Sequence, residues 1–78
     1  MDKSLHTKRG QLLRTWLREE RTGARLSMRA LAARLDVPFQ FVSKVEKGER
    51  RLDVVEFVAY CEALGVDPRV GLEAIFRQ

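Results

Sequence analysis

The stretch that decides the fold is residues 31–51, LAARLDVPFQFVSKVEKGERR, which reads as two short helices joined by a tight turn. The sequence Asp36-Val37-Pro38 interrupts the helical pattern, because a residue that precedes proline is pushed out of the α region. Two helices joined by so few residues must cross steeply, which predicts a helix-turn-helix. Apolar residues at helical spacing place one side of each helix against the other: Leu31, Ala32 and Leu35 on the first, Val42 and Val45 on the second.

Caps and apolar spacing predict three further helices. Thr7 can cap a first helix, and we expect Gly23 to end it, since glycine accepts the left-handed conformation. Asp53 and Glu56 fit a capping box, and Asp67 followed by Pro68 is a typical helix start. The expected helices are residues 7–22; 28–35, with Ser27 as N-cap; 38 or 39 to 47, closed by Gly48; 54–64, with Phe57, Tyr60, Cys61 and Leu64 on the core face; and 68–76.

Length and composition favour an all-α fold, a compact bundle of five short helices in a single domain. The chain has 78 residues, 45% of them hydrophobic and 33% charged, as in globular proteins. We expect residues 1–6 to form a flexible arm and residues 7–78 to form the domain. No apolar run approaches the ~20 residues of a membrane span, and the first ten residues lack the apolar centre of a signal peptide, so we expect a cytoplasmic protein. The single cysteine, Cys61, is expected to be buried and not reactive.

Positive charge is concentrated around the predicted helix-turn-helix. Residues 1–52 carry 13 basic and 6 acidic groups, whereas residues 53–78 carry 2 basic and 5 acidic groups. A basic face on a small domain is suited to binding phosphates by counterion release. The alternative is a solvated surface that is rich in arginine.

The residues Ser27, Leu31-Ala32, Leu35, Val37, Val42-Ser43, Val45-Glu46, Gly48 and Arg50 form a pattern that resembles one known family. It is similar to the DNA-binding domain of Cro and lambda-repressor type regulators, the xenobiotic-response-element (XRE) family. The resemblance covers roughly residues 12–76. It implies a lambda-repressor-like DNA-binding domain, a sequence-specific regulator of transcription, and a structural ion pair between Arg21 and Glu46.

The resemblance and helical geometry together suggest which side chains would meet DNA. On the second helix of the motif, one side turns away from the core, and we expect base contacts from Phe39, Gln40, Ser43 and Lys44. We expect phosphate contacts from Ser27, Arg29, Lys47, Arg50 and Arg51. Two alternatives stay open: Phe39 tucks onto the preceding helix, and Arg29 is merely solvated. Met28 stands where members of the family often carry a glutamine that contacts a phosphate, and we expect Arg29 to substitute for it.

The last helix carries more apolar surface than one small core can hide. We therefore expect a homodimer on an inverted-repeat operator, in which the protein acts as a repressor, with Val70, Leu72, Ile75 and Phe76 at the interface. The alternative is an antitoxin-like or other protein-interaction module with weak or no DNA binding, bound to a toxin or another protein. The sequence offers no nucleophile with a base and no phosphate loop, which argues against an enzyme. We expect no cofactor and no metal, since the single histidine, His6, has no ligand at suitable spacing.

Overall fold

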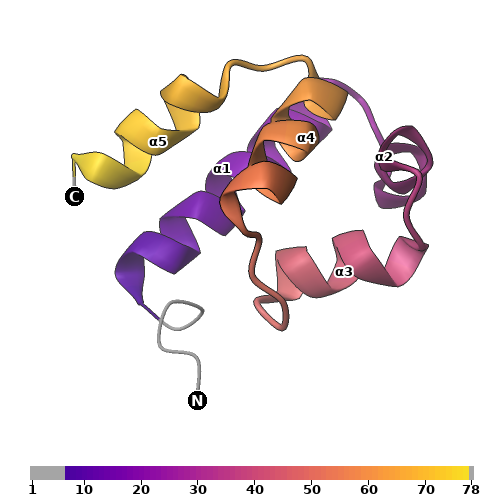
Figure 1. Ribbon diagram of the computed structural model, residues 1–78, viewed down its shortest axis with the longest axis horizontal. Helices are drawn as coiled ribbons and strands as arrows, with labels where there is room; N and C mark the ends of the chain where they lie inside the picture. Colours follow the sequence, from indigo (N-terminus) through magenta and orange to yellow (C-terminus); the bar gives the residue numbers. More distant parts are fainter. Residues whose placement is uncertain (1–6, 78) are drawn as a thin grey trace.

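The computed structural model describes residues 7–77, and the predicted arm at residues 1–6, with His6, lies outside them. The described chain folds into five helices: α1 (Lys8–Gly23), α2 (Met28–Leu35), α3 (Phe39–Lys47), α4 (Val54–Leu64) and α5 (Pro68–Phe76). Figure 1 shows α2 and α3 together on one side of the bundle and α5 on the opposite side, with α1 and α4 between them. Within the described residues the chain is all-α, as the sequence predicts.

Four of the predicted helix starts are confirmed by capping hydrogen bonds. The remaining helix, α3, begins at Phe39, and Pro38 is its N-cap without a side-chain capping bond. Thr7 and Ser27 each accept a backbone N–H three residues on, at 3.1 and 3.0 Å. Asp53 accepts the N–H of Glu56 at 2.7 Å while the Glu56 carboxylate accepts the N–H of Asp53 at 3.0 Å, so the capping box is complete. Asp67 caps α5. The short polar side chains at these positions thus fix where the helices begin.

The end of α1 differs from the prediction. Gly23 is the last residue of α1, but it does not adopt the left-handed conformation expected of it. Arg25 adopts it instead, with φ 60°, and Leu26 then donates its N–H back to the carbonyl of Arg21 at 3.1 Å. The chain therefore turns two residues later than glycine alone suggests. The prediction that Gly48 ends α3 is confirmed, with φ 78°.

The core lies where α1, α2, α3 and α4 meet. Its buried apolar residues are Leu17, Leu31, Ala32, Val42, Val45, Phe57, Tyr60, Cys61 and Leu64. The predicted core face of α4 is thereby confirmed, and burial raises the pKa of the Cys61 thiol to about 11, which keeps it protonated at neutral pH. The core holds the two helices of the motif in one fixed arrangement.

Helix α5 closes the bundle by packing across α1. Gly71 is buried at this crossing, and a Cβ atom there would lie only 2.6 Å from the Trp16 ring. Trp16 in turn packs near Phe57 of α4, with 6.4 Å between ring centroids. The absence of a side chain at Gly71 is therefore what lets α5 approach α1 so closely.

Candidate nucleic-acid interface

Helix α3 presents one polar stripe to solvent. Gln40, Lys44 and Lys47 follow each other at i, i+4 and i+7, and all three are exposed. Val42 and Val45 lie on the other side of the helix, with 0 and 2% of their surface exposed. Because α3 buries only one side, amide and ammonium groups of the stripe are free to reach outward over its whole length. Hydrogen-bond donors of this kind can read base edges.

Ser43, expected among the base contacts, lies elsewhere. Only 9% of its surface is exposed, and it belongs to the buried side of α3. Helical spacing places Ser43 at the border between the exposed and the buried side of α3, and the helices that pack against α3 cover this border. Little of Ser43 remains available to a base.

Phe39 and Arg29 form a stacked pair at the N-terminal end of α3. The Arg29 guanidinium carbon lies 4.3 Å from the centre of the Phe39 ring, a cation–π distance. Phe39 is half-buried, while Arg29 on α2 is exposed. Sequence reasoning named both residues but did not pair them. The Phe39 ring is therefore neither fully exposed nor packed onto α2 as a buried residue, and the Arg29 guanidinium is stacked on it.

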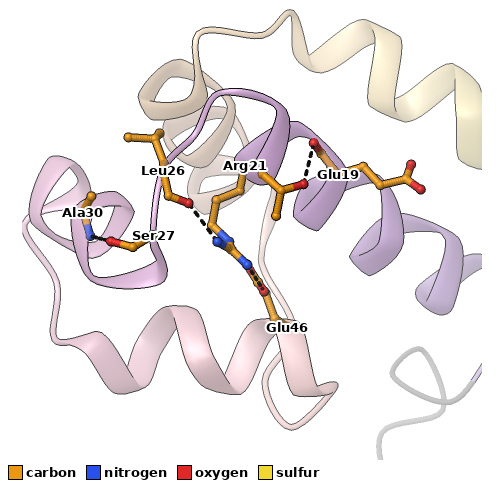
Figure 2. A network of polar contacts seen from close by, with 7 residues as sticks. Glu19, Arg21, Leu26, Ser27, Ala30 and Glu46 are labelled. Carbon is orange, nitrogen blue, oxygen red and sulfur yellow. Dashed lines mark hydrogen bonds and ion pairs between the residues drawn. The ribbon is translucent and has the colours of Figure 1, made fainter.

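The Arg21 and Glu46 side chains join α1 to α3, as the resemblance implies. Arg21 donates from Nε to Glu46 Oε2 at 2.6 Å and from Nη2 to Oε1 at 3.0 Å. Its Nη1 donates to the carbonyl of Leu26 at 2.8 Å, so one guanidinium also holds the connection before α2 (Figure 2). The side chains are 12 and 8% exposed, and the pairing raises the pKa of Arg21. This network fixes α3 relative to α1 and α2.

Arg50 has a different environment from the phosphate contact we expected. Its guanidinium donates to both Glu56 oxygens, at 3.1 and 2.8 Å, and also lies 4.2 Å from the centre of the Phe41 ring. The Arg50 side chain is 37% exposed, and the bond to it lowers the pKa of Glu56 to about 2. Arg50 therefore clamps the end of the motif onto α4, and only part of its surface could also meet a phosphate.

The remaining predicted phosphate contacts are Lys47, at the C-terminal end of the stripe, and three residues outside it. Arg51, Lys47 and Arg29 are exposed, as is Ser27. The Ser27 hydroxyl oxygen accepts the N–H of Ala30, so the residue lies at the N-terminus of α2, an end of a helix that favours negative charge. These residues come from α2, α3 and the segment that follows α3.

The residues expected at a dimer interface do not share one side of α5. Leu72 and Phe76 are 54 and 79% exposed, and Ile75 is half-buried. Val70 is 57% exposed but lies about 160° around the helix from Leu72, since each residue advances by about 100°. An apolar hollow of about 400 Å³ runs between α4 and α5, lined by Leu13, Leu52, Asp53, Val54, Phe57, Val58, Pro68, Arg69, Leu72 and Ile75. The apolar surface around this hollow thus includes residues of α4, whereas Val70 does not belong to it.

The described part of the chain offers neither a metal-binding cluster nor a membrane-spanning helix. Residues 7–77 contain no group of three or more His, Cys, Asp or Glu side chains placed to hold a metal ion. None of the described helices is long and apolar enough to cross a membrane.

Comparison with known proteins places this geometry in a family. A family model for helix-turn-helix domains matches residues 17–70. Among solved structures, an XRE-family like protein from Pseudomonas syringae pv. tomato str. DC3000 superposes with a TM-score of 0.87 and 44% identity, over 96% of this chain and 92% of that one. A search of curated proteins finds no match. The matched segment contains all of α2 and α3, and the chain belongs to the helix-turn-helix family of the XRE type, whose members are DNA-binding regulators.

Proposed function

We propose that this protein is a sequence-specific regulator that binds double-stranded DNA as a homodimer and represses transcription by occupying an operator. The observation that carries the proposal is the exposed stripe of α3. Inserted into a major groove, Gln40 can bond adenine through its amide, and Lys44 can donate to the O6 and N7 atoms of guanine. Such a regulator acts in the compartment that holds the DNA, the cytoplasm.

The stacked pair of Phe39 and Arg29 would add a further reading element. A Phe39 ring edge can pack on a thymine methyl group, while the Arg29 guanidinium beside it is attracted to the neighbouring phosphate. Because the two side chains are stacked, each limits the rotation of the other. We infer that Phe39 and Arg29 act together at the N-terminal end of α3, the recognition helix of the motif.

Phosphate contacts would position this helix without reading sequence. Lys47 lies at the C-terminal end of the stripe, and Arg51 and Ser27 lie outside it. All three are exposed and carry the donors that phosphate oxygens require. Arg50 contributes chiefly by keeping its segment against α4 through Glu56. Ser43 is not part of the proposal, because it is buried.

A dimer is proposed because one recognition helix contacts too few base pairs to define a genomic site. The apolar hollow between α4 and α5, with exposed Val54, Val58, Leu72 and Phe76 near it, offers a surface that two copies could share. Ile75 would lie at its floor, and Val70 is left out by its position on α5. Two-fold symmetry then requires an inverted repeat with half-site centres about 34–36 Å apart.

Selection of bound sequences from a random DNA pool, followed by competition binding on a panel of mutated sites, tests the reading face. Lys44→Ala and Gln40→Ala should each lose about 1–3 kcal/mol of discrimination at particular base pairs. Arg51→Ala is the matched control and should weaken all sequences alike, with a smaller salt dependence. If Lys44→Ala left base preference intact while Arg51→Ala changed it, the assignment of the reading face would be wrong.

Analytical ultracentrifugation and footprinting test the dimer. Leu72→Glu should shift the protein toward monomer, whereas Val70→Glu, on the other side of α5, should leave the dimer intact. A site whose half-sites are moved apart by half a helical turn should bind poorly. A protein that stays monomeric on DNA, or that binds equally well after the half-turn shift, would rule the dimer out. Weak or no binding to any DNA sequence would instead fit the protein-interaction alternative, in which the same apolar hollow receives a toxin or other partner.

A further inference from the structure

A polar groove lies between α1 and the C-terminal end of α3. Its volume is about 520 Å³. Half of its described lining residues are basic, two more carry an amide or a hydroxyl group, and the full set is Lys8, Gln11, Leu12, Arg14, Thr15, Arg18, Glu46 and Lys47. Among them, only Lys47 also belongs to the exposed stripe of α3. The groove therefore extends the basic surface from α3 onto α1, which the proposed function does not use.

The α1 side of this groove is a row of polar side chains. Lys8, Gln11, Thr15 and Arg18 follow each other at i, i+3, i+7 and i+10, and all four are exposed. The row extends over about 15 Å, since each residue of a helix adds about 1.5 Å. Within residues 7–77, the charged groups of Lys8, Arg18 and Lys47 have no ion-pair or hydrogen-bond partner. These three groups are the free cations of the groove.

The other two charged residues of the lining are engaged within the protein. Arg14 packs over Gly48, where an added Cβ would lie 3.0 Å from its guanidinium carbon, and its side chain has an interaction of its own. Glu46 is bonded twice by Arg21, and only 8% of its side chain is exposed. The negative charge of Glu46 is thus neutralised by Arg21 and not by the free cations. The positive field of the groove does not depend on Arg14.

This lining is suited to a row of phosphates. Leu12 is the only apolar side chain among the described lining residues and is half-buried, so an apolar ligand would gain little here. Lys8 and Arg18 lie at opposite ends of the row on α1, so a line of charges suits them better than one small anion. A strand of B-DNA supplies such a line, with one phosphate per about 3.4 Å of helix axis. The Gln11 amide and the Thr15 hydroxyl can donate to phosphate oxygens between the cations.

The position of the groove fits the proposed insertion of α3 into DNA. An inserted helix has a phosphate backbone on each side of it, because two strands border the major groove. Lys47 leads from the exposed stripe into the groove, and the two bonds from Arg21 to Glu46 hold α1 against the same end of α3 (Figure 2). We therefore expect one of the two strands to pass along the row on α1 once α3 is inserted.

We propose that the groove between α1 and α3 binds the phosphate backbone of a DNA strand beside the C-terminal end of α3. The free cations pair with phosphates of that strand, and Gln11 and Thr15 donate hydrogen bonds between them. This surface rests on the proposed function, since it meets the same DNA, and it adds α1 to the elements that contact it. Because phosphates carry no base identity, the surface strengthens binding to every sequence and reads none.

The dependence of DNA affinity on salt tests the row on α1. The double variant Lys8→Gln with Arg18→Gln removes both charges of the row, and glutamine, which is a good helix former, keeps the helix intact. On the site selected for the unaltered protein, the slope of log K against log salt should become shallower by about 1.8, about 0.9 for each lost contact. That change is a loss of affinity of about 60-fold at 0.1 M salt relative to 1 M salt. An unrelated duplex should show the same loss.

Single variants separate the groove from the overall charge of the protein. Arg18→Gln alone should make the slope shallower by about 0.9. Arg34→Gln removes the same charge from an exposed side chain of α2 that bonds the Ala63 carbonyl outside the groove, and it should leave the slope unchanged. Arg18→Lys keeps the charge and should keep the slope. Equal slopes for Arg18→Gln and Arg34→Gln, or a slope for Arg18→Lys as shallow as that for Arg18→Gln, would overturn the contact on α1.

Interference by phosphate ethylation locates the contact on the DNA. Ethylation removes the charge of a single phosphate, so it should weaken binding wherever that phosphate meets the protein. In the double variant, interference should disappear at one short run of phosphates in each half-site and persist at the others. An unchanged interference pattern would overturn the contact on α1 while leaving the proposed function in place. If the unaltered protein binds no duplex, the proposed function fails, and this contact fails with it.

Discussion

Two arginine–glutamate pairs hold α3 in place, one at each side of it, and they differ in burial. Arg21 and Glu46 are 12 and 8% exposed, and the pair joins α3 to α1. Arg50 and Glu56 are 37 and 31% exposed, and the pair joins the segment after α3 to α4. Both are bidentate, with distances between 2.6 and 3.1 Å. Similar geometry therefore stands in two different dielectric environments.

The difference in burial determines how much each pair contributes to the stability of the fold. A buried charge that loses its partner keeps its desolvation cost, so the inner pair is strongly needed once it exists. An exposed charge that loses its partner is rehydrated, so the outer pair contributes little by itself. Glu56 also completes the cap of α4, which adds a role that Glu46 lacks. The inner pair should matter for the stability of the bundle, and the outer pair for local order at its end.

The largest effect is expected from breaking the inner pair. Glu46→Ala should lower the free energy of unfolding by about 3–5 kcal/mol, because Arg21 would remain in a largely buried position with only the Leu26 carbonyl as its partner. Urea denaturation measures the loss, with the exposed Glu49→Ala as control. A double-mutant cycle with Arg21→Ala gives the coupling directly, and a coupling near zero would contradict the role of the pair.

A smaller loss is expected from the outer pair. Glu56→Ala should destabilise the protein by about 1–2 kcal/mol, through loss of the capping bond and of an exposed ion pair. Glu56→Gln keeps the capping bond, since glutamine can occupy the same position of a capping box, and should lose less. Exposed Glu62 on the same helix supplies the control Glu62→Ala. Should Glu56→Ala cost as much as Glu46→Ala, burial would not be the deciding variable.

Acid should reveal the outer pair. The pKa of Glu56 is lowered to about 2, first by the Arg50 hydrogen bonds and then by the Asp53 N–H, against about 4.3 in an unfolded chain. A lowered pKa means that the stabilisation is complete above about pH 5 and is lost as the pH falls through 2. The unfolding free energy of Glu56→Gln should therefore fall less steeply than that of the unaltered protein between those values. Parallel curves in urea titrations at each pH would contradict this assignment.

The smallest difference is expected in salt. Raising NaCl from about 0.1 M to about 1 M shortens the Debye length from about 10 to about 3 Å, which screens exposed charges much more than buried ones. The coupling between Arg50 and Glu56 should shrink toward zero, while the coupling between Arg21 and Glu46 should be retained. Double-mutant cycles at both concentrations compare them. Equal screening of the two would mean that the inner pair is hydrated.

The sequence determined the helices and their beginnings because these depend on local chemistry. Ser27, Asp53 and Asp67 each bond a backbone N–H within three residues, which no distant contact needs to arrange. The core face of α4 follows from apolar spacing for the same reason. The stripe of Gln40, Lys44 and Lys47 could be named from helical periodicity once the buried valines of α3 were known.

Only the tertiary structure decided whether residues at the border between the buried and the exposed side of a helix are covered by another segment. Ser43 is buried, Arg29 stacks on Phe39, and Arg50 is held by Glu56 and Phe41, since each of these outcomes depends on which side chain of another segment arrives alongside. The residue with left-handed backbone conformation after α1 is Arg25 and not Gly23, because the hydrogen bond from the Leu26 N–H to the Arg21 carbonyl determines the turn. Helical periodicity determines how side chains point around the axis of one helix. Which of these side chains touch another helix depends on how the helices cross, as α5 crosses α1 at Gly71.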